Sequence, residues 1–494
     1  MTHYLLAIDQ GTTSSRAIIF SFSGEPLSHH QIDVQLFYPH EGWVEHDPDE
    51  IWTNTYLCCQ EALKKINLSA NNIAAIGISN QRETTIIWDK KTGKAIYPAI
   101  VWQDRRTSVL CEKLKENKSL ANIQQKTGLL LDPYFSATKI MWLLDNVPYA
   151  REKALKGELL FGTIDTFLLW KLTQGRAHAT DATNASRTML FNIHTQQWDN
   201  EILQVLEIPP NILPEVLNSS AQFGHTAKDL FGESIAICGI AGDQQAATIG
   251  QACFSEGMIK CTYGTGCFML LNTGNTPLFS QNKLLTTIAY RLENKTVYGL
   301  EGSIFCAGAT IKWLRDSLKL IHTAAESEEL AKSIQNTEGV YLVPAFTGLG
   351  APYWNSHARA AILGLTRNTG VAQIVRAALE AVAYQTCDLL NAMKKDGVTQ
   401  LKTLRVDGGM VANNWLLQFL ADILTINVQR SHCLETSALG AAYLAGLGAG
   451  VYHSLEQIAE LWRSNANLEP TMPISTRESL YQGWLKAVFH FLKP

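Results

Sequence analysis

Short apolar runs alternate with longer helical patterns along the whole chain, which is typical of an α/β protein. The apolar runs predict buried strands at residues 5–9, 17–20, 73–78, 159–162, 235–240 and 404–406. Helical periodicity predicts helices at residues 371–393, 414–424 and 437–447. The last of these is rich in Ala and Gly, so we expect it to pack closely against other backbone.

At 494 residues the chain is too long for one ordinary hydrophobic core, so two large domains are expected. A run of small residues gives way to a new series of strands near Gly250, which predicts domains at residues 1–249 and 250–494. Residues 5–20 and 258–271 both predict a hairpin with a Gly-Thr turn. This similarity fits either an internal duplication or two unrelated hairpins.

Charge and cysteine usage exclude some classes of protein. The net charge is −4 and both signs are interspersed, which argues against nucleic-acid binding. No apolar run is long enough to insert in a membrane, and the first residues lack the basic start of a secretory leader. The 10 cysteines show no C-x-x-C spacing, so we expect a reduced, cytoplasmic protein.

The common phosphate-binding motifs are missing. The sequence contains no G-x-x-x-x-G-K-[ST] loop and no G-x-G-x-x-G between a strand and a helix, and it lacks H-E-x-x-H and Cys/His zinc spacings. It contains instead Gly-rich turns at the ends of three predicted strands.

The first of these turns follows residues 5–9. Asp9 at the strand end can hold hydrated Mg²⁺, because Mg²⁺ keeps most of its waters and needs few carboxylates. Thr12, Thr13 and Ser14 can donate to phosphate oxygens, and Arg16 adds a positive charge. A plain β-hairpin with a polar tip explains the same residues.

The second turn is Gly264-Thr265-Gly266, which can bind phosphates or be an ordinary tight hairpin. The third begins at Gly408-Gly409 and leads to Asn413 at a helix start, where an adenosine can lie against the backbone. An ordinary strand-to-helix loop is the alternative there. Three phosphate-compatible turns in one chain favour a nucleotide cleft.

Other polar residues are suited to bind a small polyol. Arg82 and Glu83 follow a predicted strand and offer donors and acceptors to neighbouring hydroxyl groups, although such a pair is often a surface ion pair. Tyr134 and Gln244 can bind further hydroxyls. Asp243 is a candidate general base, but a single Asp after Gly is also a common helix N-cap. Trp102 and Phe268 can flank the apolar face of the acceptor, or be packing residues.

Several segments together resemble the FGGY family of carbohydrate and polyol kinases, in the actin-like ATPase superfamily. These segments are residues 9–16, 80–85, 134–146, 242–245, 263–268, 360–365 and 377–380. The resemblance spans residues 5–449. It implies two actin-like (ribonuclease H-like) ATPase domains with a nucleotide and substrate cleft between them, use of ATP and Mg²⁺, and a homo-oligomer.

The motifs are most similar to those of family members that phosphorylate glycerol to glycerol 3-phosphate. The resemblance implies that glycerol is contacted by Arg82, Glu83, Tyr134, Asp243 and Gln244, with Trp102 and Phe268 as apolar walls. It implies that the adenine nucleotide is lined by Gly308, Gly409 and Asn413. In-line transfer with Asp243 as base would follow.

The sequence also departs from the family. Lys312 stands where these members usually carry Gln, and residues 223–234 lack the Gly-rich, Arg-bearing loop with which some of them bind a sugar-bisphosphate inhibitor. Two alternatives remain open. One is a kinase for another polyol or a ketose, and the other is an actin-like nucleotide switch that needs no acceptor site.

Overall fold

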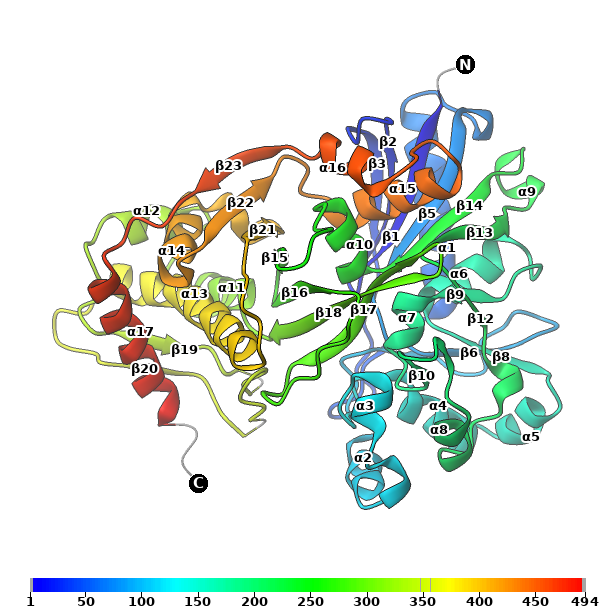
Figure 1. Ribbon diagram of the computed structural model, residues 1–494, viewed down its shortest axis with the longest axis horizontal. Coiled ribbons are helices and arrows are strands. Elements are labelled where there is room, and N and C mark those ends of the chain that lie inside the picture. The colour runs from blue at the N-terminus through cyan, green and yellow to red at the C-terminus, as the bar shows by residue number, and fades with distance from the viewer. Residues whose placement is uncertain (1–2, 347, 356, 491–494) are drawn as a thin grey trace.

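Two mixed β-sheets form the centre of the computed structural model, which describes residues 3–346, 348–355 and 357–490. The first has six strands in the order β13-β14-β5-β1-β2-β3, and the second has seven in the order β17-β18-β16-β15-β21-β22-β23. Figure 1 shows the first sheet on the right and the second on the left, each with helices packed around it. The predicted α/β architecture is confirmed.

The first sheet contains β1 (Tyr4–Gln10), β2 (Ser14–Phe20), β3 (Pro26–Asp33), β5 (Ile73–Asn80), β13 (Ser220–His225) and β14 (Ala236–Gly242). β1 pairs antiparallel with β2 and parallel with β5, and β5 pairs parallel with β14. The register aligns Gln10 with Asn80 and Asn80 with Gly242. The carboxyl ends of these strands therefore lie at one edge, where α/β sheets commonly bind ligands.

The second sheet repeats this arrangement. Its strands are β15 (Ile259–Tyr263), β16 (Cys267–Gly274), β17 (Leu285–Leu292), β18 (Lys295–Ile304), β21 (Thr403–Asp407), β22 (Asn427–Ser431) and β23 (Ser464–Leu468). The strands β18-β16-β15-β21-β22 match β3-β2-β1-β5-β14 in their directions and in the order in which they follow one another along the chain. The similarity between the two hairpins is thus part of a repeated topology. The main helices around this sheet are α11 (Gly308–Asp316), α12 (Glu326–Lys332), α13 (Val371–Lys395), α14 (Asn414–Leu424) and α17 (Ile474–Phe489).

Two helices connect the sheets. α10 (Asp243–Gly250) packs tightly against α15 (Thr436–Gly448), and α15 lies against β5 and β14 of the first sheet, far away in sequence (Figure 1). A Cβ at Gly440 would lie 1.7 Å from the Ala246 carbonyl oxygen, and a Cβ at Gly77 would lie 2.0 Å from the Ala441 oxygen. Only glycine permits these approaches. The predicted close packing of this helix is confirmed.

A long insertion after β5 carries smaller elements around the first sheet. It forms two-stranded ribbons from β6 (Ile86–Asp89) with β8 (Leu159–Gly162), β9 (Ala179–Asp181) with β12 (Glu215–Leu217), and β10 (Phe191–Asn192) with β11 (Gln197–Trp198). β7 (Ala99–Ile100) in the insertion pairs with the earlier β4 (Glu45–His46). Its helices include α2 (Ser108–Lys115), α3 (Ile123–Thr127), α4 (Ser136–Asn146), α5 (Ala150–Leu155), α6 (Ile164–Leu172), α7 (Ala182–Ser186) and α8 (Asn200–Val205). α1 (Pro48–Lys65) is not part of the insertion: it precedes β5 and packs on β2 and β3. The strand predicted at residues 159–162 is therefore present, but outside the central sheets.

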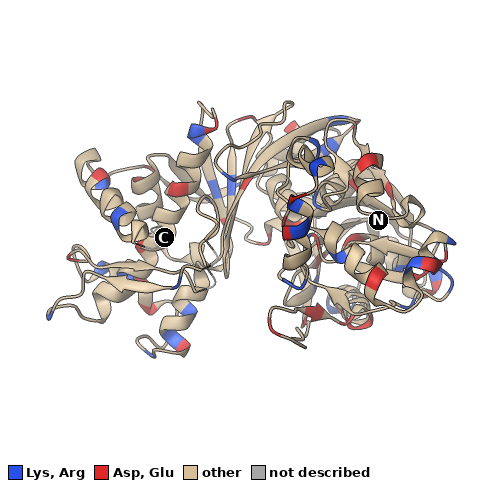
Figure 2. Cartoon of the chain, turned by 90° about the horizontal axis from the view of Figure 1, so that it is seen from below, with Lys and Arg blue, Asp and Glu red and all other residues tan. Residues whose placement is uncertain are grey.

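Charged residues of both signs are interspersed over both halves (Figure 2). In the part of the chain that the structure describes, no helix combines the length and apolarity needed to cross a membrane. No disulfide bond joins cysteines of these described residues.

Candidate active site

Three predicted site residues lie at the carboxyl edge of the first sheet. Asp9 is near the end of β1, Arg82 follows β5, and Asp243 follows β14. The Nε atom of Arg82 lies 3.2 Å from Oδ1 of Asp243. The strand register described above brings these residues together, although they are separated by up to 234 positions in sequence.

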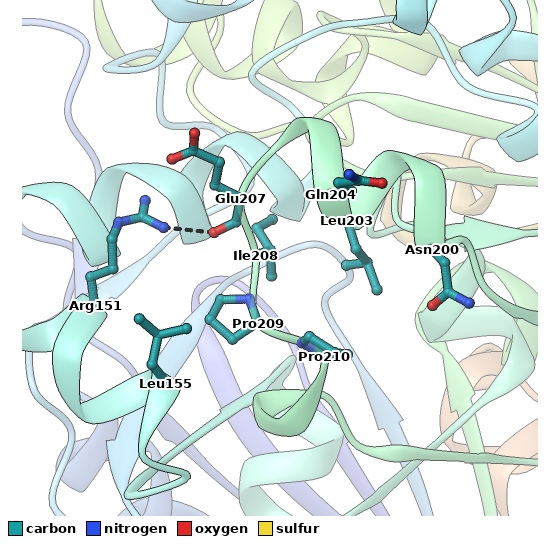
Figure 3. A pocket seen from close by; sticks show the side chains of 9 residues that line it. All are labelled: Arg151, Leu155, Asn200, Leu203, Gln204, Glu207, Ile208, Pro209 and Pro210. Atoms are coloured by element: carbon teal, nitrogen blue, oxygen red, sulfur yellow. Dashed lines mark hydrogen bonds between the residues drawn. The ribbon is translucent and has the colours of Figure 1, made fainter.

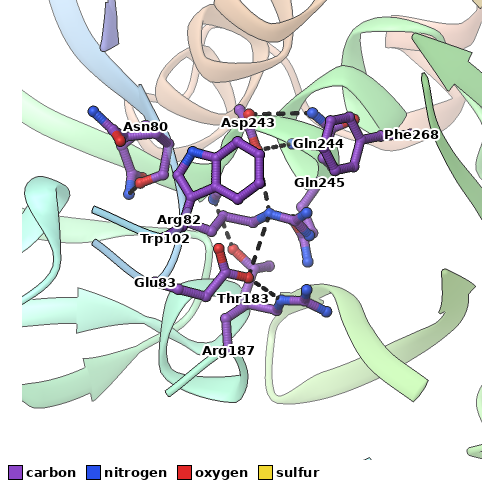
Figure 4. Close-up of polar contacts among 12 residues, drawn as sticks. Asn80, Arg82, Glu83, Trp102, Thr183, Arg187, Asp243, Gln244, Gln245 and Phe268 are labelled. Atoms are coloured by element: carbon purple, nitrogen blue, oxygen red, sulfur yellow. Dashed lines mark hydrogen bonds and ion pairs between the residues drawn. The ribbon is translucent and has the colours of Figure 1, made fainter. Parts of the chain in front are cut away.

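A buried cluster of charges surrounds Arg82 (Figure 4). Glu301 of β18 accepts hydrogen bonds from both terminal nitrogens of Arg82, one of them 3.2 Å long, and from Nη2 of Arg187 at 3.0 Å. Nε of Arg187 donates to Glu83 at 2.6 Å, and Glu83 lies 4.0 Å from Arg82. All four side chains are buried. The predicted pair Arg82–Glu83 is therefore one half of a network and not a surface ion pair.

Glu301 and Arg187 were not predicted. Burial alone would raise the pKa of Glu301, but Arg187 and Arg82 outweigh it and lower this pKa to about 2. The same carboxylates hold the pKa of Arg82 above its usual value in spite of burial. Glu301 and Arg82 are thus charged at neutral pH, whereas burial raises the pKa of Glu83 in spite of Arg187 and Arg82. A glutamate directly after the apolar Leu300, in the buried half of β18, is the one signal that points to Glu301 in the sequence.

Asp243 is the accessible carboxylate of this site. Its side chain is 31% exposed, whereas the side chains of Arg82 and Glu301 are 2% and 1% exposed. Asp243 is the first residue of α10, and Gly242 occupies the N-cap position. Its Oδ1 accepts from the backbone N–H of Gln244 at 2.7 Å, and its Oδ2 accepts from Nε2 of Gln244 at 3.1 Å. These bonds hold the carboxylate in place and leave one side open.

Three aromatic residues form a wall beside these polar groups. The ring of Trp102 meets Tyr134 edge-on at 5.6 Å and Phe268 at 6.1 Å between centroids. Tyr134 is buried, which raises the pKa of its hydroxyl and keeps it protonated as a donor. Nε1 of Trp102 donates to the hydroxyl of Thr12 at 2.9 Å. The wall therefore connects the predicted acceptor residues to the first hairpin.

The first hairpin places Asp9 beside its strand partner Arg16. Burial raises the pKa of Asp9 to about 6, Arg16 lowers it in part, and the carboxylates of Glu435 and Asp243 raise it further. Arg16 forms an ion pair with Glu435, at the start of α15, and its Nε is buried without a partner among the described residues. Excess negative charge at Asp9 and an unused donor at Arg16 suit a cation and a phosphate. Thr13 is exposed and Ser14 is buried.

The second and third Gly-rich turns meet at the edge of the second sheet. The carbonyl oxygen of exposed Thr265 accepts from Ala307 and Ala309, and Gly308 donates to Gly264 at 3.0 Å. A Cβ at Gly308 would lie 2.6 Å from the Gly264 oxygen, and one at Gly408, where φ is +92°, would lie 2.5 Å from the Tyr263 oxygen. Nothing lies within 4 Å of a Cβ position at Gly409. Close backbone packing with an open face is compatible with a flat ligand.

Other predicted nucleotide residues have structural partners. Asn413 caps α14 by accepting from Leu416 N–H at 2.9 Å, and its Nδ2 lies 3.4 Å from the hydroxyl oxygen of Ser327. Lys312 is exposed on α11.

Across residues 3–346, 348–355 and 357–490, no hydrogen bond joins the turn at 11–14 directly to the turn at 264–266. In the same residues, no group of three or more His, Cys, Asp or Glu side chains is placed to bind a metal ion. A single carboxylate such as Asp9 still fits Mg²⁺, which binds largely through water and phosphate.

A surface pocket of about 470 Å³ lies away from all these residues (Figure 3). It is formed by α5, α8 and the loop after α8, where Arg151 donates to the Glu207 carbonyl at 2.6 Å. Its lining residues are Arg151, Leu155, Asn200, Leu203, Gln204, Glu207, Ile208, Pro209 and Pro210. None of them was predicted to carry chemistry.

Comparison with known proteins gives matches over the whole chain. Residues 4–250 match the N-terminal domain, and residues 259–449 the C-terminal domain, of the FGGY family of carbohydrate kinases. The chain is 59% identical over 495 residues to a glycerol kinase of Coxiella burnetii (strain Dugway 5J108-111), covering 100% of this chain and 99% of the relative.

Solved structures agree. The fold matches Plasmodium falciparum glycerol kinase with ADP at a TM-score of 0.93 and 40% identity, covering 100% of this chain and 99% of that one. It also matches a ligand-bound xylulose kinase of Lactobacillus acidophilus at a TM-score of 0.87 and 22% identity, covering 97% and 96%. The second likeness concerns the fold alone. The predicted two-domain α/β fold is confirmed by these matches.

Proposed function

Because this chain belongs to the FGGY family of carbohydrate kinases, we propose that it transfers the γ-phosphate of ATP to glycerol, giving glycerol 3-phosphate in the first step of glycerol use. The observation that carries the proposal is the arrangement of Arg82, Asp243 and Gln244 beside three aromatic rings. It offers donors and one accessible carboxylate to a small acceptor with an apolar face.

A triol presents hydroxyl groups that both donate and accept. In the proposed site Arg82, Gln244 and Tyr134 donate, while Glu83 and Asp243 accept. Trp102 and Phe268 meet edge to face, 6.1 Å between centroids, and together present an apolar surface to the carbon chain of the acceptor. The charged groups of a buried network are already oriented before the reaction, so little free energy is needed to reorganise them during it.

The proposed chemistry needs a base for the acceptor hydroxyl. Asp243 takes the hydroxyl proton on a carboxylate oxygen as the hydroxyl oxygen attacks the γ-phosphorus and the bond to the leaving ADP oxygen breaks. Arg82, 3.2 Å from Oδ1, orients the carboxylate. Mg²⁺ bound near Asp9 would offset charge on the phosphates, a role supported by the raised pKa of this carboxyl, which burial causes and the neighbouring carboxylates increase.

The nucleotide part of the proposal uses both sheets. Thr12, Thr13, Ser14 and Arg16 bind phosphates from one side and Thr265 from the other, while Gly308, Gly409 and Asn413 line the adenosine. The same proposal divides the chain into domains at residues 1–249 and 250–494, with the cleft between them. It also includes a cytoplasmic homo-oligomer, which size-exclusion chromatography with light scattering tests.

A coupled ADP-release assay tests the proposed function. The purified protein is assayed with ATP and Mg²⁺ against glycerol, erythritol, xylulose and no acceptor. We expect turnover with glycerol well above the other three. Faster turnover with xylulose or erythritol would assign another acceptor. A rate of ATP hydrolysis that is the same with and without each acceptor would favour a nucleotide switch.

A further inference from the structure

Lys260 is a buried cation outside the predicted site. It is the second residue of β15, and its side chain is fully buried. Its Nζ donates to Oε1 of Gln244, to the hydroxyl of Thr262 at 2.9 Å, and to the carbonyl of Phe268 at 3.4 Å. No carboxylate forms an ion pair with it in the described ranges of the chain. Burying an unpaired ammonium group is expensive, so its presence needs an explanation.

The contact with Gln244 determines which way that amide points. An ammonium group only donates, so the amide atom facing Lys260 is the oxygen. The amide nitrogen must then face the other way, where it donates to Oδ2 of Asp243 at 3.1 Å. The second N–H of this nitrogen has no protein acceptor among the described residues. It is therefore available to an acceptor hydroxyl.

Lys260 also completes the charge balance of the cluster. Arg82 and Arg187 face three carboxylates, those of Glu83, Glu301 and Asp243. Lys260 acts on Glu301 as a further positive charge that lowers the pKa of this carboxyl. We expect this charge to affect the stability of the cluster, whereas the contact with Gln244 affects the acceptor.

The position of Lys260 in the fold connects the acceptor residues to the second sheet. Gln244 and Asp243 open α10, whereas Lys260 lies on β15, whose end leads into the Gly264-Thr265-Gly266 turn. The correct amide orientation therefore depends on a strand that also carries a proposed phosphate contact.

We propose that Lys260 is a positioning residue for phosphoryl transfer, which holds the Gln244 amide so that it donates both to Asp243 and to the acceptor hydroxyl. This inference rests on the proposed function and extends it to a residue that acts through Gln244. The geometry that supports the proposal is a continuous chain of hydrogen bonds: Lys260 donates to the Gln244 amide oxygen, and the Gln244 amide nitrogen donates to Asp243.

The first experiment compares Lys260→Met with the wild type in the ADP-release assay. We expect kcat/KM for glycerol to fall about tenfold to a hundredfold, while KM for ATP changes little, because a hydrogen bond to a charged group is lost next to the acceptor. Lys295→Met, at an exposed position of β18, is the control and should behave as wild type. Unchanged kinetics for glycerol in Lys260→Met would overturn the inference.

A double-mutant cycle separates positioning from general damage. In a Gln244→Leu background there is no amide to orient, so Lys260→Met should cost no more than about twofold in kcat/KM. The full loss in that background would show that Lys260 acts elsewhere and would overturn the inference. Lys260→Arg, which keeps a cationic donor, should recover part of the activity. If Lys260→Met fails to fold, Lys260→Leu, which also has no donor, is measured in its place, with the same two outcomes.

The acceptor panel keeps this inference apart from the proposed function. If the wild type phosphorylates another polyol instead of glycerol, the acceptor assignment is wrong, and the cycle is measured with that polyol. Coupling between Lys260 and Gln244 would then still support the positioning role, and its absence would still refute it. A wild type that uses no acceptor at all would overturn both.

Discussion

The charge of Glu301 should make a measurable contribution to stability, because two buried arginines share it. Burial alone would raise the pKa of Glu301, but Arg187 and Arg82 lower it from 4.5 to about 2. Each pKa unit corresponds to about 1.4 kcal/mol of interaction with the charged form. The ionised carboxylate of this fully buried residue therefore contributes about 3 kcal/mol to the free energy of unfolding at pH 7.

The dependence on pH follows from the sign of this shift. The folded pKa lies below the unfolded value of 4.5, so the contribution is complete above that pH and is lost as the pH falls toward 2. Glu301→Gln removes the charge at every pH. We expect it to lower the free energy of unfolding by about 3 kcal/mol at pH 7, and by about 1 kcal/mol less than that at pH 4.

Urea unfolding of the wild type, Glu301→Gln and Glu293→Gln at both pH values tests this prediction. Glu293 is an exposed glutamate in the turn before β18, so its neutral variant controls for the loss of one negative charge. The reasoning is refuted if the two variants unfold at the same urea concentration at pH 7. It is also refuted if the deficit of Glu301→Gln is unchanged at pH 4.

The remaining predictions concern the base, the cation site and the helix contact. Asp243→Asn should lower kcat by about 10²- to 10⁴-fold, because the proton of the acceptor hydroxyl loses its base. Calorimetry should show little change in the affinity for ATP. Near-normal turnover would exclude Asp243 as the base. Burial raises the pKa of Asp9 from 3.8 to about 6, so folding loses stability as the pH rises through that value. Without Mg²⁺ or nucleotide, Asp9→Asn should therefore be more stable than wild type by about 3 kcal/mol at pH 7.5, but by only about 0.5 kcal/mol at pH 4, as thermal unfolding can check. Gly440→Ala should lower the free energy of unfolding by at least about 2 kcal/mol, because the added Cβ would lie 1.7 Å from the Ala246 oxygen. Gly370→Ala is the control, since the nearest atom to its added Cβ is 3.5 Å away. Equal melting temperatures for the two variants would contradict the packing argument.

The elements and the family could be predicted from the sequence, because their signals are local. A strand at residues 73–78 is visible as an apolar run and is observed as β5, and the helix predicted at 414–424 is observed as α14 with the same bounds. Gly-Thr turns lie between apolar strands in both hairpins. Burial periodicity and turn residues depend on neighbours a few positions away, so they can be read without the fold.

The partners of the site residues could not be predicted in this way. Glu301, Arg187 and Lys260 are charged residues in apolar surroundings, and each looks unfavourable until its partner is known. Those partners lie in distant parts of the sequence: Arg82, in the loop after β5, is 219 positions from Glu301. The balance between burial and pairing, which decides whether such a charge is tolerated, exists only once the sheets are assembled.

The placement of α15 shows the same limit at the scale of whole elements. Its sequence predicts a helix with small residues on its surface, which is a local property. Only the tertiary structure places it against β5 and β14 of the first sheet, with Gly77 and Gly440 at the backbone contacts. Sequence thus determined which segments are helices, strands and phosphate-compatible turns. The tertiary structure decided which charges meet, because side chains interact through space and their separation along the chain carries no information about that distance.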